Sequence, residues 1–295
     1  MTSRLRICAA VLATGTILTG CGAGSPASSP TPPPTTASSA TSASPSTPAS
    51  MSPSMSASAN PTGQVTVPVY WVGATRQGPR LFREFASAAP GTPGAASAAA
   101  AALGVMLTGS AADPAYDSGW PSNTTLTASG LAGLVVTVAL DLHGARPLAR
   151  SSLAVQQLVY TATGAQPGTR AVTIRQSSGS STVTLHSVAR APQADVLAPI
   201  WIINPQWGAT VTGPTIRVTG TAAVFEAQLA WRIRQGSQVV ASGTATASIG
   251  APDRGSWSFV TPKLSPGTYV IEAYDRSMED GSVVAIDQAQ VSVTG

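Results

Sequence analysis

The sequence predicts two folded parts, an α+β two-layer sandwich followed by an all-β sandwich. Helix-like and strand-like periodicities are interspersed over residues 65–188, whereas only strand-like alternation occurs over residues 200–295. Between them, residues 189–199 lack periodicity and contain two prolines, so we assign them to a linker. The roughly 230 residues after the N-terminal tract are enough for two ordinary domains.

In the first part, strands are predicted where β-branched and aromatic residues gather. Pro68 lies inside the first of these runs and favours an edge strand or a bulge there. The last two runs are joined by a hairpin turn at 177–180. The predicted strands are 65–72, 131–140, 171–174 and 182–185.

Two helices are predicted between these strands. The first covers residues 95–107, with Thr92-Pro93 as N-cap and first helical position and with Gly109 at its end. The second follows Ser151-Ser152, carries apolar residues at helical spacing and ends at Gly164. The resulting order β–α–β–α–β–β is that of a small two-layer sandwich.

The second part alternates with a period of two residues, and turn residues separate its apolar runs. Seven or eight short strands with this spacing indicate a β-sandwich. The runs are 200–203, 216–218, 228–233, 239–242, 256–259, 269–274 and 283–286.

The N-terminus carries an export signal. Residues 1–20 contain two arginines, then an apolar run too short to span a membrane, then small residues. The tetrapeptide Leu18-Thr19-Gly20-Cys21 resembles the bacterial lipobox, which implies cleavage before Cys21 and lipid on its sulfur. The alternative is ordinary signal-peptide cleavage with Cys21 incidental. Residues 21–64 then form an uncharged Ser/Thr/Pro tract that cannot bury a core, so we interpret it as a disordered tether.

Composition and motifs exclude several classes of function. Charged residues make up only 9% of the chain, and no Lys/Arg cluster supports a nucleic-acid partner. The only cysteines are Cys8 and Cys21, so the exported domains are predicted to fold without disulfides. His143 and His186 stand apart from other metal ligands, so we predict no metal and no cofactor. We also find no nucleophile–base, zinc-protease or phosphate-loop motif, and therefore predict that the protein is not an enzyme.

Acidic pairs in the sequence are interpreted as turns first. Asp113 and Asp117 offer two carboxylates, but Asp-Pro and Asp-Ser-Gly are turn sequences, and Glu279-Asp280-Gly281 resembles a hairpin turn.

The six tryptophans divide into two groups. Trp71, Trp231 and Trp257 lie in predicted strands and are expected in the cores. The other three lie at or near loops and are candidates for a protein- or sugar-binding surface. For the first of them, packing into the core of its own domain is the competing interpretation. These three are Trp120, Trp201 and Trp207.

Four segments of the first part occur in the order found in the GerMN domain, a family named for sporulation and germination proteins. They are 98–109, 120–126, 136–142 and 154–163, of which Gln157-Leu-Val-Tyr-Thr161 is the most specific. The second part, through 200–218 and the string Gly220-Thr-Ala-Ala-Val-Phe-Glu226, resembles the immunoglobulin-like domain of bacterial spore-germination proteins. The pairing strengthens both resemblances, because this second module commonly follows GerMN.

These resemblances imply a lipid-anchored extracytoplasmic scaffold or binding protein of the cell envelope. It would be held on the outer face of the cell membrane by its lipid and would act through contacts with an envelope protein. The alternative is a cell-wall carbohydrate-binding module, or an accessory to wall hydrolases, that binds peptidoglycan or another glycan. Exposed aromatic residues along one face would favour sugar, whereas a flat apolar patch would favour a protein partner.

Overall fold

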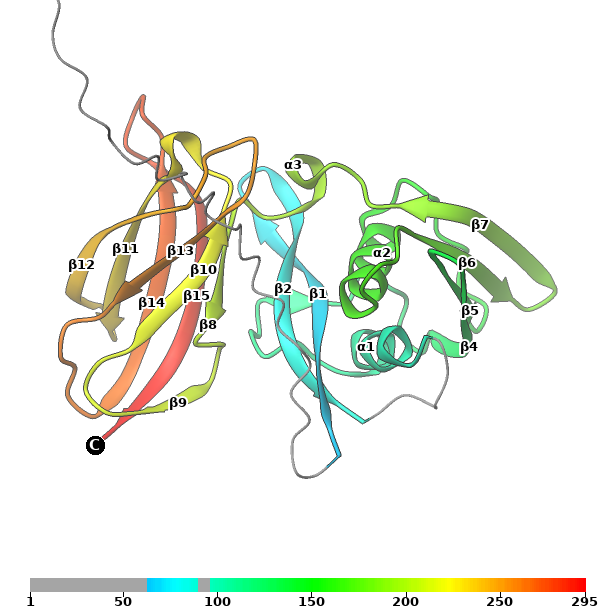
Figure 1. The fold of residues 1–295 in the computed structure, drawn as a ribbon, viewed down its shortest axis with the longest axis horizontal. Helices are drawn as coiled ribbons and strands as arrows, with labels where there is room; N and C mark the ends of the chain where they lie inside the picture. The colour runs from blue at the N-terminus through cyan, green and yellow to red at the C-terminus, as the bar shows by residue number, and fades with distance from the viewer. Residues whose placement is uncertain (1–62, 90–95) are drawn as a thin grey trace, which may run out of the picture. The chain divides into compact units, whose positions relative to one another are not determined.

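The computed structural model describes residues 63–89 and 96–295 (Figure 1). The predicted signal peptide, Cys21, most of the predicted tether and the predicted cap Thr92-Pro93 lie outside these residues. Within the described ranges, none of the helices has both the length and the apolar character to cross a membrane.

The first domain, here residues 65–189, contains a four-stranded sheet in the order β4-β5-β6-β7. The central pair β5 and β6 is parallel, and both outer pairs are antiparallel. The hairpin turn predicted at 177–180 joins β6 to β7, with Gly179 at a φ of 57°. The strands are β4 (Thr125–Ala132), β5 (Val135–Asp141), β6 (Ala171–Ser178) and β7 (Ser181–Ala189).

Two helices, α1 (Ser97–Thr108) and α2 (Leu153–Ala165), pack on this sheet, as the two-layer prediction expects. A second sheet, in the order β2-β1-β3, packs on the other side of the helices (Figure 1). Its strands are β1 (Val65–Thr75), β2 (Gly78–Ala88) and β3 (Tyr116–Asp117). The α+β architecture is therefore confirmed, with an additional hairpin that covers the helices.

The structure of this domain differs from the prediction in three features. Residues 131–140 form two strands rather than one, because Gly133 adopts a φ of 58° and turns the chain between β4 and β5. The hairpin strand β2 was not predicted at all. Gly164 lies inside α2 rather than after it, and a side-chain carbon there would make an ordinary contact with the Tyr70 ring at 3.5 Å. The predicted cap Ser152 is confirmed, since its hydroxyl accepts the Val155 N–H at 3.2 Å.

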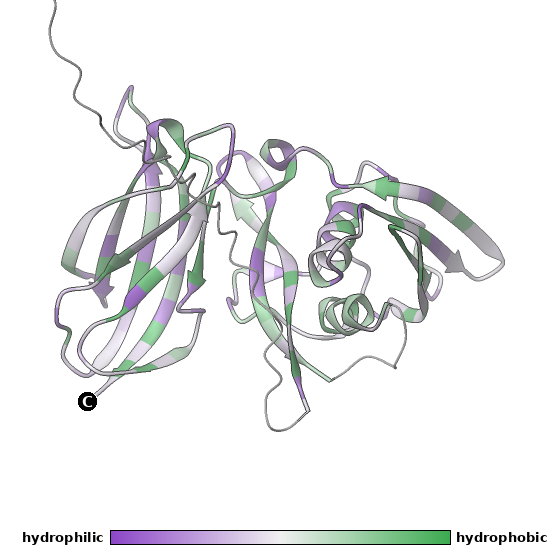
Figure 2. Ribbon diagram, in the orientation of Figure 1, coloured by the Kyte–Doolittle hydropathy of each residue, from purple (hydrophilic) through white to green (hydrophobic). Residues whose placement is uncertain are grey.

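The second domain, here residues 200–295, is the predicted β-sandwich. One sheet has the order β13-β10-β8 and the other β12-β11-β14-β15-β9. Hydrophobic and hydrophilic residues alternate along several of these strands (Figure 2), as expected where one face is buried. The strands are β8 (Ile200–Asn204), β9 (Ala209–Thr212), β10 (Arg217–Ala222), β11 (Gln228–Gln235), β12 (Gln238–Thr246), β13 (Gly255–Val260), β14 (Gly267–Arg276) and β15 (Val283–Thr294), with a 3₁₀ turn η1 (Phe225–Ala227).

Each domain has its own hydrophobic core, and Trp71, Trp231 and Trp257 lie in these cores as predicted. A third cluster draws on both domains and on the segment between them. It combines Tyr70, Leu81, Phe82 and Tyr160 of the first domain with Trp201 of the second and with Val196, Leu197 and Ala198.

The segment assigned to the linker, 189–199, is packed rather than free. It contains the short helix α3 (Gln193–Val196), and the Ala198 N–H donates to the Leu81 carbonyl at 2.9 Å. Leu197 also forms a parallel bridge with Leu81. The chain between the two domains therefore adds a short strand-like contact to the edge of β2.

Candidate functional site

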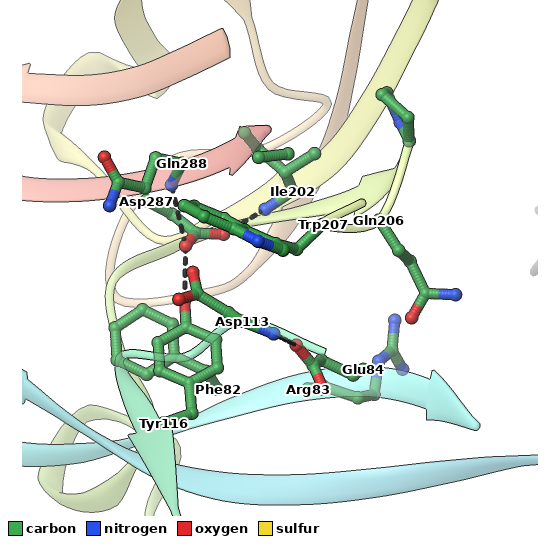
Figure 3. Close-up of a pocket in the computed structure, with 12 residues that line it drawn as sticks. Phe82, Arg83, Glu84, Asp113, Tyr116, Ile202, Gln206, Trp207, Asp287 and Gln288 are labelled. Atoms are coloured by element: carbon green, nitrogen blue, oxygen red, sulfur yellow. Dashed lines mark hydrogen bonds between the residues drawn. The ribbon is translucent and has the colours of Figure 1, made fainter. Parts of the chain in front are cut away.

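A small polar cavity lies where β2 and the loop before β3 contact β8 and β15 (Figure 3). Its volume is about 20 Å³, which is enough for about one water molecule. The polar side chains around it include Glu84, Asp113, Tyr116, Gln206 and Asp287. Three carboxyl groups and a phenol thus gather at one place in a chain that has few charges.

Asp287 is the centre of this cluster. Its side chain is buried, and its Oδ1 accepts the Tyr116 hydroxyl at 2.5 Å while its Oδ2 accepts the Ile202 N–H at 2.6 Å. Figure 3 shows the carboxyl group between the phenol and the β8 backbone. Burial raises the pKa of Asp287 to about 7, because loss of hydration outweighs these hydrogen bonds. The pKa of Tyr116 is also raised, first by burial and then by the nearby Asp287 charge.

Glu84 and Asp113 fix the loop that carries Tyr116. The Glu84 carboxylate accepts the backbone N–H groups of Ala112 and Asp113 at 2.8 and 2.9 Å. Asp113 accepts the Ala115 N–H at 2.8 Å, which is the turn expected of Asp-Pro. Burial raises the pKa of both carboxyl groups. Their partners are backbone donors, so they act here as loop clamps.

A second set of contacts surrounds Trp201. The Arg254 guanidinium lies 4.0 Å from the centre of the Trp201 ring and donates to the Ala198 carbonyl at 2.6 Å. Arg83 approaches the same ring at 5.6 Å. Nearby, the Gln206 side chain accepts the Phe85 N–H at 2.7 Å and so joins the β8–β9 loop to β2.

The structure separates the three candidate interface tryptophans. Trp120 is 6% exposed, packs in the first core and donates its indole N–H to the Ala154 carbonyl at 2.8 Å. Trp201 is 3% exposed and packs against Tyr70 in the cluster shared by both domains. Trp207 is half-buried and lines the small cavity. Neither Trp120, in the loop before β4, nor Trp201, in β8, contributes to an exposed aromatic face, because other elements cover both side chains.

Both histidines are exposed: His143 follows the end of β5, and His186 lies within β7. His143 Nε2 lies 3.1 Å from the Thr125 hydroxyl, and the Asp141 carboxylate accepts the His143 backbone N–H at 2.8 Å. His186 is exposed on β7. Over 63–89 and 96–295, no three His, Cys, Asp or Glu side chains are arranged to hold a metal ion.

An open groove of about 750 Å³ lies next to His143. Hydroxyl and amide side chains of Thr108, Ser122, Asn123 and Thr125 line it together with Leu107 and Thr124. Two of its residues, Asn123 and His143, adopt left-handed φ values of 70° and 47°. Such values are uncommon outside glycine and recur at ligand sites, so the groove is a second candidate site.

The sequence did not indicate the residues that carry these contacts. Tyr116, Asp287, Glu84 and Arg254 belong to no motif and are far apart in the chain. One signal was present: Asp287 shares its strand face with Ala285 and Ala289, so an alternating strand extended past 286 would place a carboxyl group inside.

Comparison with known proteins gives two family matches. Residues 68–178 match the family model described as sporulation and spore germination. Residues 199–282 match that of the immunoglobulin-like domain of bacterial spore germination. No curated protein matches the sequence.

Solved structures resemble parts of the chain. The tandem GerMN domains of the sporulation protein GerM from Bacillus subtilis align at 14% identity and a TM-score of 0.35, over 45% of this chain and 46% of that one. An engineered protein aligns at 18% identity and a TM-score of 0.29, over 37% and 22%. CopC from Methylosinus trichosporium OB3b aligns at 18% identity and a TM-score of 0.23, over 32% and 92%. This chain spans less than half the length of the first two.

The family matches fall on the two sandwiches in the order that the sequence predicted. The chain therefore carries a GerMN-type sporulation and spore germination domain followed by the immunoglobulin-like domain of bacterial spore germination proteins.

Proposed function

We propose that this protein is a lipid-anchored extracytoplasmic scaffold of the cell envelope that acts through contacts with another envelope protein. The observation that carries the proposal is an exposed apolar site on the second domain. Phe225, in η1, is 69% exposed, and Ile249, in the turn after β12, is 48% exposed. Exposed aromatic and aliphatic side chains on a held loop are typical of protein-binding surfaces.

The loop that carries Phe225 is held in one conformation. The Ala227 carbonyl accepts the Ala247 N–H at 2.8 Å, and the Val224 carbonyl accepts the Ala251 N–H at 2.9 Å. These bonds place the Phe225 and Ile249 segments side by side. The two residues after Phe225, Glu226 and Ala227, adopt left-handed φ values of 53° and 57°, and such strain is usually retained where a loop has a role.

The polar cavity between the domains supports a scaffold rather than a catalyst. It has room for about one water, so a substrate would not reach its carboxyl groups without separation of the domains. Its groups are instead used to hold β2, β8 and β15 together. A rigid pair of domains would keep Phe225 at a fixed place relative to the first domain.

The partner-binding proposal is tested by crosslinking and pull-down from intact envelopes. The full-length wild type should retain an envelope protein that Phe225→Ala loses. Val260→Ala is the matched control, because Val260 is 55% exposed on β13, outside the Phe225 loop. Equal recovery with Phe225→Ala and wild type would reject this surface as the binding site.

The anchor is tested separately. Cys21→Ala should lose incorporation of labelled fatty acid and leave the membrane fraction, since the lipobox-like tetrapeptide directs modification to this sulfur. A Cys8→Ala variant controls for loss of a cysteine. Equal labelling of Cys21→Ala and wild type would reject the anchor and, with it, the location on the outer face of the membrane.

A second candidate function, binding of a cell-wall glycan, is favoured by the groove beside His143. Its uncharged hydroxyl and amide lining suits a neutral polyol such as a sugar. The buried Trp120 and Trp201 do not support sugar stacking. Titration of wild type and Asn123→Ala with soluble peptidoglycan fragments tests it, and absence of binding by the wild type would remove this candidate.

A further inference from the structure

We propose that β7 is a self-association edge, through which two copies of this chain pair as antiparallel strands. The inference deepens the proposed function by naming one partner as a second copy, and it rests on the proposed anchor only for the local concentration argued below. Its basis is the exposure, chemistry and symmetry of the strand.

Within the described ranges, β7 pairs with β6 alone, at the edge of the four-stranded sheet (Figure 1). Its residues Ser181 to Thr184 are exposed, and Val183 is 40% exposed. The strand contains no Lys, Arg, Asp, Glu or Pro. Those are the residues by which proteins usually prevent an edge from pairing with another chain.

The other edge strands differ from β7 in composition, in contacts or in length. The edge strand β2 contains Pro79, Arg80, Arg83 and Glu84. The two edges of the four-stranded sheet, β4 and β7, each have one register shift, between Leu126 and Ala128 in β4 and opposite Val172 and Ile174 in β7. The shift in β7 falls at His186 and Ser187, beyond its exposed stretch, whereas β4 is the shorter strand and contains Gly130. The edge strand β12 has a register shift against β11 and also contacts β13 of the other sheet. β7 combines length with an open, uncharged stretch.

The free stretch is short and has a natural centre. The His186 carbonyl already accepts a hydrogen bond from Arg150, and Ser187 has a φ of 47°, so regular free strand ends before His186. The remaining residues, Ser181–Leu185, have Val183 as their middle residue. Antiparallel pairing of two such stretches places Val183 opposite Val183 of the second copy.

The pairing that results is self-complementary. Thr182 of one copy lies opposite Thr184 of the other, and Ser181 lies opposite Leu185. β-Branched and Thr–Thr cross-strand pairs stabilise antiparallel sheets, and no like charges meet. This pairing relates the two copies by a two-fold axis, and the four-stranded sheet of each copy would continue into that of the other. Both copies would then use the same surface, which makes the interface isologous.

Such an interface is small, so we expect weak association in free solution. Anchoring both copies to one membrane would raise their effective concentration without any new contact. A location on one membrane therefore favours a second copy of this chain as the partner of the β7 edge.

Cysteine crosslinking of the full-length chain in membranes tests the register. Residues directly opposite in an antiparallel pair have Cα atoms about 4.5–5.5 Å apart, within reach of a disulfide. Val183→Cys should give a crosslinked dimer above the wild-type background. Ser129→Cys, exposed on the other edge strand β4, is the matched control and should not. Equal crosslinking of the two variants would overturn the proposal.

Charge exchange tests the same contact without a covalent bond. Val183→Lys and Val183→Glu should each weaken self-association of the full-length chain in detergent by about fivefold or more, because like charges then face each other. An equimolar mixture of V183K and V183E should restore it, and melting curves of both variants should match the wild type. Retained association of either variant alone, or no recovery in the mixture, would overturn the proposal. Envelope pull-down through Phe225 is independent of these results, so failure of one proposal is distinguishable from failure of the other.

Discussion

The Tyr116 phenol donates a hydrogen bond of 2.5 Å to the carboxylate of Asp287, 171 positions further along the chain. The same carboxylate accepts the backbone N–H groups of Ile202 and Gln288. One buried acidic group therefore joins β3 to β8 and β15. Because a carboxyl group in this environment is easier to protonate, the contact between the domains is expected to depend on pH.

The first prediction is that stability falls as pH rises from about 4 toward 7. Burial raises the pKa of folded Asp287 to about 7, whereas an unfolded Asp has a pKa of about 3.9. Between these values the folded state binds a proton that the unfolded state has released, so its stabilisation is full below about pH 4 and is lost through about pH 7. The raised pKa values of Glu84 and Asp113 act in the same direction. The melting temperature measured from pH 4 to pH 8 checks this.

Two variants test whether Asp287 causes this fall of the melting temperature with pH. Asp287→Asn should flatten it, because the amide stays neutral at every pH tested. Tyr116→Phe keeps the ring that stacks on Phe82 at 4.5 Å but removes the donor that lowers the pKa of Asp287. The pKa of folded Asp287 should therefore rise further in Tyr116→Phe. The loss of stability should then continue to a higher pH in this variant than in the wild type. A pH profile of Asp287→Asn that retains the full wild-type slope would show that Asp287 is not the group responsible.

The second prediction concerns Gln157, the first residue of the segment most specific to the family. Its side chain donates to the Tyr70 carbonyl at 2.8 Å and accepts the Gly119 N–H at 2.9 Å, and Thr161, one helical turn later, accepts the Tyr70 N–H at 3.0 Å. Gln157→Leu should lower the free energy of unfolding by about 2–4 kcal/mol, because the buried Tyr70 carbonyl and the half-buried Gly119 N–H lose their partners. Urea denaturation measures it. Gln77→Leu, in the exposed β1–β2 turn, is the control, and equal stability of the two variants would contradict this role.

The same helix shows where periodicity succeeded and where it failed. Apolar spacing located α2 and its Ser152 cap correctly, but it did not indicate that the side chains of Gln156 and Gln157 are both buried. The Gln157 amide is buried where β1 covers α2 and bonds to Tyr70, whereas the Gln156 amide is buried by the end of β7 and the segment after it, where it bonds to Ala189 and Ala191. The spacing of residues along one helix identifies its apolar face. It does not reveal that other segments also cover the helix and form hydrogen bonds with its polar side chains.

Trp201 shows why the candidate site could not be predicted from the sequence. Alternation in β8 correctly places Ile200 and Ile202 in the second core, which leaves Trp201 on the other face. That face is exposed in an isolated sandwich, and here it meets Tyr70 and Arg254. A contact between two domains joins residues with no sequence relation, so neither it nor the Tyr116–Asp287 pair was predictable from motifs.

The third prediction treats Trp120 as a core residue. Trp120→Ala should cost about 3–5 kcal/mol, because it empties a buried site and leaves the Ala154 carbonyl without its donor. Trp120→Phe retains most of the buried ring and should lose less. Thermal unfolding of both variants measures the difference. If Trp120→Ala melted normally and lost an envelope partner, Trp120 would be an interface residue after all.

The last prediction concerns Arg254, whose guanidinium lies against the Trp201 ring and donates to Ala198 and Pro199 carbonyls at 2.6 and 3.3 Å. Burial lowers its pKa to about 10, which still leaves it protonated at neutral pH. Arg254→Ala should destabilise the protein by about 2–3 kcal/mol, because it removes both a desolvated cation–π contact and charged hydrogen bonds. Arg254→Lys should recover only part of this, since an ammonium lacks the planar fork that serves ring and carbonyls together. Arg217→Ala, exposed on β10, controls for the loss of one charge. Urea unfolding followed by tryptophan fluorescence makes the comparison, and an Arg254→Ala variant as stable as Arg217→Ala would show that the segment before β8 docks without it.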